Sequence, residues 1–260
     1  SRRLSMDAFT LLLAGVAAFF AGLLDSIVGG GGLIMTPAMV NLFPDFPILQ
    51  VIATQRTSSI FGTSVAAWNY LKVVKLDRRV LIVTCVAATL CSALGVQFAK
   101  RIDADLLKYI VLGVCVVLAL YTAFRKDFGQ RERLPADAVA TQRRSGSVGA
   151  VTGFYNGLIG PGTGTLMVFG FVGVVGFDFL GASALAKLAN VAADLSSWFS
   201  LMLSGFVVWT VALPLVIGNM LGSHVGSKLA IRKGDAFIRR VFLLVVLGLI
   251  ARFVWMLFLS

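Results

Sequence analysis

The segment Gly22-Leu-Leu-Asp25-Ser-Ile-Val-Gly29-Gly-Gly-Gly-Leu-Ile-Met-Thr-Pro37 places four consecutive glycines directly after an apolar run that begins near residue 8. A second glycine-rich break, Gly160-Pro-Gly162-Thr-Gly164, follows an apolar run over 147–160. Glycine weakens a helix and lets other backbone approach closely. Each segment therefore predicts a helix that is interrupted within an apolar environment.

Apolar runs of this kind recur along the whole chain. Many are close to the roughly 20 residues that cross a bilayer as a helix. Hydrophobic residues make up 58% of the 260 residues, charged residues only 13%, and a soluble domain could not hide so much apolar surface. We therefore predict an all-α polytopic membrane protein. The apolar runs extend over 8–28, 33–43, 50–71, 80–99, 107–124, 147–160, 164–176, 182–203, 207–228 and 237–258.

The net charge of +11 does not indicate nucleic-acid binding, because the basic residues cluster in short segments between the apolar runs. The sequence shows no metal-ligand cluster, no Ser/His/Asp constellation and no haem-type histidine pair, so neither an enzyme nor a cofactor is expected. The expected location is a bacterial-type inner (plasma) membrane, crossed several times, with the lipid bilayer as a partner. A homo-oligomer is compatible with the sequence, which leaves the oligomeric state open.

The chain contains an internal repeat. One constant, ungapped shift of the sequence, called here the repeat shift, aligns Gly15 with Gly146 and also aligns rarer cations, which chance identities in apolar sequence rarely do. We predict a first membrane repeat over 1–124, a cytoplasmic linker over 125–146 and a second membrane repeat over 147–260. The other aligned pairs include Gly22 with Gly153, Gly29 with Gly160, Gly31 with Gly162, Arg56 with Lys187, and Arg101 with Arg232.

Two topologies are compatible with the broken helices. Each can cross the membrane once, which gives eight crossings and parallel halves, or turn back as a hairpin followed by three further transmembrane helices, which gives inverted repeats. Parallel halves put 12 basic residues in the inner loops and 8 in the outer loops. Inverted halves put 15 inside, in 72–79, 125–144 and 228–240, and 5 outside. Cytoplasmic enrichment of Lys and Arg favours the inverted repeats. Whether 33–43 spans the membrane or turns back stays open.

Arg56 and Lys187 are cations inside apolar runs, and they correspond under the repeat shift. A cation in a membrane helix is costly unless it is paired, hydrated or functional. One interpretation is that both snorkel to the membrane interface. The other is that they approach one central cavity from opposite sides, which would suit an anion.

The glycine breaks support the second interpretation, because a helix that begins inside the membrane presents unpaired N–H groups and a positive potential. Tight helix packing is the alternative, and it is favoured for Gly222 and Gly226. Asp25 and Asp194 are either proton carriers or partners of the two cations. The predicted substrate-binding residues are Gly29, Gly30, Gly31, Gly32, Gln55, Arg56, Gly160, Gly162, Thr163, Gly164, Lys187 and Asn190.

The paired glycine segments resemble the TauE/SafE sulfite-exporter family over nearly the whole chain. The segments that carry the resemblance are 22–37, Ala53-Thr-Gln-Arg56, Gly153-Phe-Tyr-Asn-Gly157-Leu-Ile-Gly160-Pro-Gly162-Thr-Gly164, Lys187-Leu-Ala-Asn190 and Gly222-Ser-His-Val-Gly226-Ser-Lys228. The resemblance implies a secondary transporter that exports sulfite, organosulfonates or related sulfur oxyanions, driven by the proton-motive force. Its partner would be a small anionic sulfur-containing substrate.

The chain departs from the family pattern at two places, which bear on the exact substrate. Pro161 and Thr163 interrupt the second glycine cluster, and Arg56 stands where a lysine is expected. Arginine offers a planar fork to two oxygens, whereas lysine offers a point charge, so the pair Arg56 and Lys187 could bind one sulfonate asymmetrically. A small-anion channel and an uptake carrier for another anionic or sulfur-containing metabolite remain alternatives.

Overall fold

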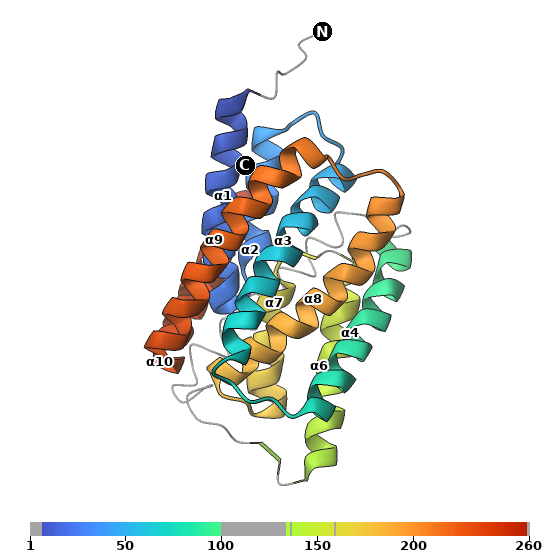
Figure 1. The fold of residues 1–260 in the computed structure, drawn as a ribbon, viewed down its shortest axis with the longest axis vertical. Helices are drawn as coiled ribbons and strands as arrows, with labels where there is room; N and C mark the ends of the chain where they lie inside the picture. Colours follow the sequence, from blue (N-terminus) through green and yellow to red (C-terminus); the bar gives the residue numbers. More distant parts are fainter. Residues whose placement is uncertain (1–6, 100–133, 136, 159, 259–260) are drawn as a thin grey trace.

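The computed structural model describes residues 7–99, 134–135, 137–158 and 160–258, and this part of the chain is helical and contains no strand (Figure 1). The predicted all-helical class is confirmed for these residues. A short π-helix, η1 (Phe171–Val175), continues α7. The helices are α1 (Ala8–Val28), α2 (Gly31–Leu42), α3 (Ile48–Leu71), α4 (Arg78–Ala99), α6 (Ala138–Leu158), α7 (Thr163–Gly170), α8 (Phe179–Leu203), α9 (Trp209–Lys233) and α10 (Asp235–Phe258).

The second half begins earlier than the apolar run at 147–160 predicts, since α6 starts at Ala138. Asp137 explains the difference, because its carboxylate accepts a hydrogen bond of 2.9 Å from the Val139 N–H and so caps the helix. Residues 138–146 of the predicted linker are therefore helical. The predicted run over 107–124, the linker residues 125–133 and Arg101 lie outside the described residues.

The helix bounds follow the repeat shift. α3 begins at Ile48 and α8 at the corresponding Phe179, while α4 begins at Arg78 and α9 at the corresponding Trp209. Helix α1 packs along α9, and their counterparts α6 and α4 pack along each other. In Figure 1, α1 and α3 run downward from the end at which the chain begins, whereas α6 and α8 run upward.

Two glycine turns interrupt the chain at corresponding places. Gly29 has φ 86° and ends α1, and Gly160 has φ 87° and follows α6, a backbone conformation that favours glycine. After the first turn the chain returns in α2 to the end where α3 begins (Figure 1). The two breaks touch, since a Cβ atom on Gly164 would lie 2.6 Å from the Cα atom of Gly29.

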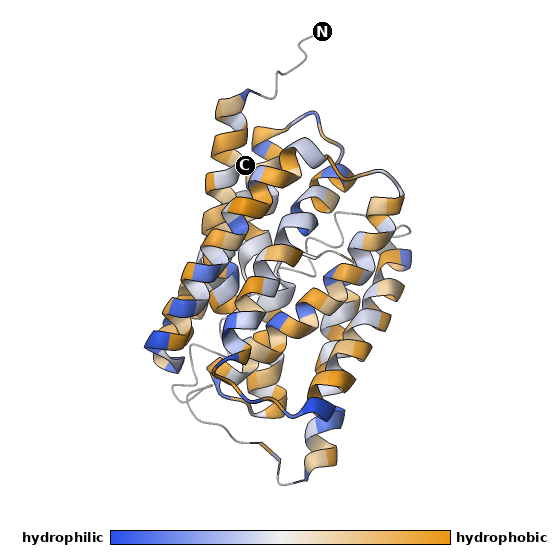
Figure 2. Cartoon of the chain, in the orientation of Figure 1, coloured by the Kyte–Doolittle hydropathy of each residue, from blue (hydrophilic) through white to orange (hydrophobic). Residues whose placement is uncertain are grey.

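The described part of the molecule is apolar outside and polar inside. Figure 2 shows apolar residues along the sides of the helices and hydrophilic residues gathered at the lower end. The interior holds polar side chains of α3, among them Thr54, Gln55, Arg56, Thr57 and Ser58. A soluble protein has the reverse arrangement, so this exterior suits a lipid environment. The exposed apolar residues include Phe9, Leu12, Val16 and Phe20 on α1, Ile82, Val86, Leu90, Leu94 and Phe98 on α4, and Leu213, Ile217, Leu221 and Val225 on α9.

By length and hydropathy alone, two helices among the described residues could cross a membrane, Ala8–Val28 and Arg78–Phe98. Gly31–Leu42 and Thr163–Val175 are apolar but shorter. Helix α3 is less apolar on average than these helices because polar side chains occupy its buried face. Its exposed face is largely apolar.

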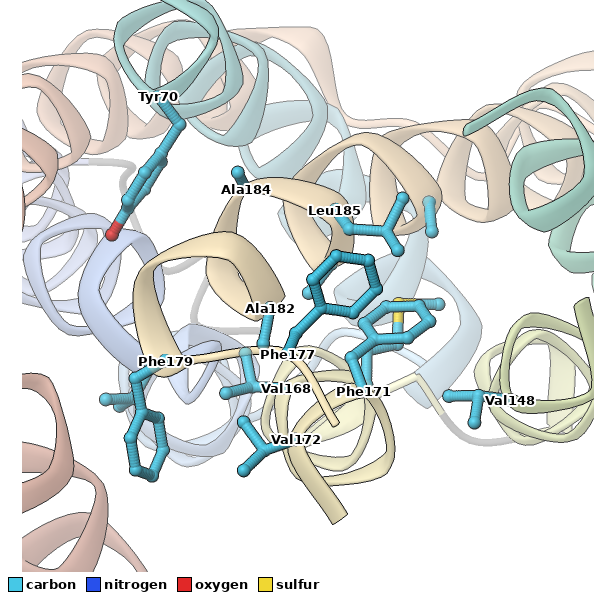
Figure 3. Packing of buried hydrophobic residues seen from close by; sticks show 14 of the residues in the cluster. Tyr70, Val148, Val168, Phe171, Val172, Phe177, Phe179, Ala182, Ala184 and Leu185 are labelled. Atoms are coloured by element: carbon cyan, nitrogen blue, oxygen red, sulfur yellow. The ribbon is translucent and has the colours of Figure 1, made fainter. Parts of the chain in front are cut away.

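An apolar core fixes the second break in place. Figure 3 shows Phe171 and Phe177 beside Leu185, so that η1 and the turn after it pack on α8. Phe179 at the start of α8 packs on Phe242 of α10, with ring centroids 5.8 Å apart. These contacts set the position of α7, whose first residues face the other break.

Candidate functional site

A polar cavity of about 50 Å³ lies where the two glycine breaks meet α3 and α8. A single water needs about 10–15 Å³, so the cavity has room for a group of a few non-hydrogen atoms. All of the predicted site residues line it except Gly30 and Lys187. The lining residues are Asp25, Gly29, Gly31, Gly32, Met35, Gln55, Arg56, Ser58, Ser59, Gly160, Pro161, Gly162, Thr163, Gly164, Asn190, Asp194 and Asn219.

Arg56 brings a positive charge to the cavity from α3. Its Nη2 atom donates a hydrogen bond of 2.6 Å to the backbone carbonyl of Asn156 on α6. The guanidinium lies against Gly160, where a Cβ atom would come within 2.6 Å of Nη2. Within the described part of the chain Arg56 makes no other hydrogen bond, so most of its five N–H donors are left for a ligand.

Lys187 is engaged by α1 and does not line the cavity. Its Nζ atom donates to the backbone carbonyl of Asp25 and lies 3.4 Å from the Asp25 carboxylate. Lys187 is 1% exposed and Arg56 6% exposed, so neither side chain reaches the surface as snorkelling would require. Of the two interpretations of Asp25, its position fits that of a cation's partner.

The Asp25 carboxylate also accepts a hydrogen bond from the first residue of α2. Its Oδ1 atom accepts from the Gly31 N–H at 3.2 Å, and its Oδ2 atom accepts from the Thr63 hydroxyl at 3.1 Å. The Gly29 turn places the first residue of α2 beside the last turn of α1, which is why this side chain reaches it. The Gly31 N–H is therefore not free for an anion, unlike the unpaired helix start that the sequence predicts.

Asp194 on α8 is a cavity carboxylate held by neutral groups. Its Oδ1 atom accepts from the Asn156 amide at 2.9 Å, and its Oδ2 atom accepts from the Asn190 amide at 3.2 Å and the Ser59 hydroxyl at 3.3 Å. Among the described residues no Lys or Arg nitrogen lies within 4.0 Å of this carboxylate. Asp194 and Asp25 thus have different environments although both line the cavity.

Several cavity residues were not predicted from the sequence. They are Met35, Ser58, Ser59, Pro161 and Asn219. The repeat could have indicated Ser59, because the repeat shift pairs it with Asn190. It could not have indicated Asn219, whose counterpart is the apolar Ala88.

In the described part of the chain, helices with an apolar exterior surround two breaks that meet at a polar cavity, and this is the architecture of a membrane transporter. The family model described as "Sulfite exporter TauE/SafE" matches residues 14–253. The chain belongs to this family, as the resemblance in the sequence implies, and it is a helical membrane transporter.

Similar proteins are named as transporters. A Sinorhizobium protein named "Probable membrane transporter protein ORF9" is 32% identical over 91% of this chain and 89% of its own length. The Escherichia coli K12 protein named "Probable membrane transporter protein YfcA" is 31% identical over 90% of this chain and 87% of its own length. A Haemophilus influenzae relative, also named "Probable membrane transporter protein", is 28% identical over 97% of this chain and 96% of its own length. No solved structure matches the chain.

Proposed function

We propose that the protein is a secondary transporter in a bacterial-type inner membrane that exports sulfite or organosulfonate-type sulfur oxyanions, driven by the proton-motive force. The observation that carries the proposal is Arg56, a buried guanidinium with spare donors at a cavity between two broken helices. Buried cations in membrane segments usually mark substrate or ion pathways. The family description and the names of the relatives support the same class.

In this proposal the oxyanion head group binds to the guanidinium of Arg56, whose planar fork matches two oxygens. The Gln55 side chain adds a donor, because its Oε1 atom accepts from Thr36 at 3.0 Å and its amide nitrogen is left for the cavity. The glycines allow the backbone to approach the anion. Lys187 is paired with Asp25 and does not contact the substrate in this proposal, whereas the sequence predicts that it binds the substrate directly.

We further propose two inverted repeats, each a glycine-broken hairpin followed by three transmembrane helices. The opposite directions of α1 and α6 in Figure 1 support this, as does the packing of α1 on α9 and of α6 on α4. The basic segments 72–79 and 228–240 lie at the lower end of the molecule (Figure 2), which fits one cytoplasmic side. Rocking of the halves about the cavity would give alternating access.

Asp25 and Asp194 are the proposed proton-coupling residues. Both carboxylates line the cavity, and intramembrane acids commonly carry protons in coupled transporters. Asp194 is the stronger candidate, because Asp25 is already paired with Lys187.

The test is sulfite flux in proteoliposomes with an imposed pH gradient. The wild type is expected to give saturable flux that depends on the gradient. Arg56→Gln should abolish this flux, whereas Arg79→Gln, which removes an exposed cation near the start of α4, should keep it. Flux without saturation or response to the gradient would indicate a small-anion channel, and accumulation against a gradient in the uptake direction would indicate an uptake carrier. No flux of any sulfur oxyanion would contradict the proposed substrate class.

A further inference from the structure

We propose that the preferred ligand is a monoanion that carries its own hydrogen-bond donor, with its oxyanion oxygens on Arg56 and its donor on Asp194. The inference rests on the proposed function and narrows its substrate class. It follows from the charges and from the hydrogen-bonding capacity of the cavity wall.

The cavity offers one cation, Arg56, and one carboxylate, Asp194, that have no ion-pair partner within 4.0 Å among the described residues and attract each other only at longer range. Lys187 lies 3.4 Å from the Asp25 carboxylate, so these two charges offset each other. Arg56 donates only to a neutral carbonyl, and Asp194 accepts only from neutral amides and a hydroxyl, among the described residues. A dianion would face a single cation, Arg56, whose charge Asp194 already partly offsets, and the carboxylate would repel the dianion strongly in a dry site.

The wall around Asp194 has acceptor capacity to spare. A carboxylate offers about four lone-pair sites, and Asp194 uses three of them, one on Oδ1 and two on Oδ2. Asn156, whose amide nitrogen donates to both Asn190 and Asp194, also leaves its buried Oδ1 atom without a partner in the described part of the chain, but Asn156 does not line the cavity. The remaining lone pair of the cavity-lining Asp194 therefore favours a ligand that donates a hydrogen bond.

Small monoanions with a hydrogen-bond donor exist. Hydrogensulfite combines a single negative charge with a proton, and sulfamate combines a single negative charge with two N–H donors. Sulfate and thiosulfate lack the donor and carry two charges, while simple alkanesulfonates lack the donor. The cavity of about 50 Å³ restricts the choice to compact ligands.

The hydrogen bond from the ligand to Asp194 couples ligand binding to the protonation of this carboxylate. The donor of the ligand and a free proton both require a lone pair of Asp194, so loading of the ligand favours the ionised carboxylate. The charged groups that face Asp194 are Arg56 from α3 and Asp25 from α1. An empty carrier can return with Asp194 protonated, which exchanges an outward anion for an inward proton.

A matched pair of ligands tests the inference on the wild-type protein. Sulfamate and methanesulfonate have nearly the same size and the same single charge near neutral pH, but only sulfamate carries N–H donors. Titration calorimetry of the full chain in nanodiscs should show sulfamate binding at least about tenfold tighter, as expected for one hydrogen bond to a charged group. Equal affinities would overturn the inference.

Two variants assign the effect to its residue. Asp194→Asn should reduce the ratio of the two affinities to about threefold or less, chiefly because methanesulfonate then meets an amide instead of a carboxylate. Asp45→Asn removes an acid from the exposed loop between α2 and α3 and should keep the wild-type ratio. An Asp194→Asn ratio unchanged from the wild type would contradict the assignment.

The outcomes separate the inference from the function. If both ligands bind equally and both depend on Arg56, the cavity is a simple oxyanion site, so the inference fails and the proposed function stands. If neither ligand binds and sulfite is not transported, the proposed function fails, and the inference fails with it.

Discussion

Arg56 on α3 donates a hydrogen bond of 2.6 Å to the backbone carbonyl of Asn156 on α6. Lys187 on α8 donates in the same way to the carbonyl of Asp25 on α1. The repeat shift relates the two donors and also the two acceptors. Each cation therefore holds the last turn before the glycine break of the other half. They differ in one respect. Among the described residues only Lys187 has a carboxylate within 4.0 Å, whereas Arg56 lines the cavity and attracts Asp194 at longer range.

Gly160→Ala should disable the site by displacing Arg56. The added Cβ atom would come within 2.6 Å of Nη2, and φ at this position is 87°. We expect sulfite affinity, measured by titration calorimetry, to fall by at least about tenfold, the loss of roughly one charge-assisted contact.

Gly205→Ala is the matched control for this variant. Its φ is 75°, so the backbone strain of roughly 1–2 kcal/mol is similar, but a Cβ atom there meets nothing within 4 Å. Binding should survive in Gly205→Ala. Equal loss of affinity in both variants would show that backbone strain, and not the contact with Arg56, is responsible.

Lys187→Met should destabilise the protein more than it alters the cavity. It leaves the Asp25 carboxylate buried without its cation, a change that typically costs about 3–5 kcal/mol. The thermal midpoint in detergent should fall, and the double variant Lys187→Met with Asp25→Asn should recover most of the loss. A single variant as stable as the wild type would refute this structural role.

The sequence predicts the helices and both breaks because glycine clusters and apolar runs are local signals. It also predicts most of the residues that line the cavity, because the glycine breaks and the charged residues inside apolar runs, Asp25, Arg56 and Asp194, are visible in the sequence. It does not predict the unequal roles of Arg56 and Lys187, which depend on Asp25 lying on the broken helix of one half while its counterpart in the other half is Asn156.

The hydrogen bond between the positions of Asp25 and Thr63 also reverses its direction from one half to the other. In the first half Thr63 donates to the Asp25 carboxylate. In the second half Asp194 stands in place of Thr63, and its carboxylate accepts from the amide of Asn156, which stands in place of Asp25.

Because the two breaks are in contact, we expect that Gly164 cannot be replaced by a larger residue without loss of stability. In Gly164→Ala the Cβ atom would lie 2.6 Å from the Cα atom of Gly29, and backbone on both sides leaves no flexible group to move. Overpacking of this kind costs about 1–3 kcal/mol or more, and a lower thermal midpoint should report it. Gly15→Ala is the control, because its Cβ atom would lie 3.4 Å from the nearest atom, the carbonyl oxygen of Pro214. If both variants have the same thermal midpoint as the wild type, the two breaks are not in contact.

The proposed inverted topology predicts opposite accessibility for two loops. With Cys85, Cys91 and Cys115 replaced, a membrane-impermeant thiol reagent added to intact cells should label Asp45→Cys between α2 and α3. It should label Lys75→Cys between α3 and α4 only after the cells are permeabilised, because this basic loop is expected in the cytoplasm. Labelling of both positions from the same side would rule out a crossing by α3.

Calorimetric titration of sulfite into the purified wild type and into Arg56→Gln tests the central claim most directly. The wild type should bind saturably, and Arg56→Gln should lose at least about tenfold in affinity, since a charge-assisted contact is removed. The exposed-residue variant Arg79→Gln should bind like the wild type, and the thermal midpoints of all three proteins should confirm that they are folded. A folded Arg56→Gln that binds sulfite as tightly as the wild type would contradict the assignment of Arg56 as the anion site.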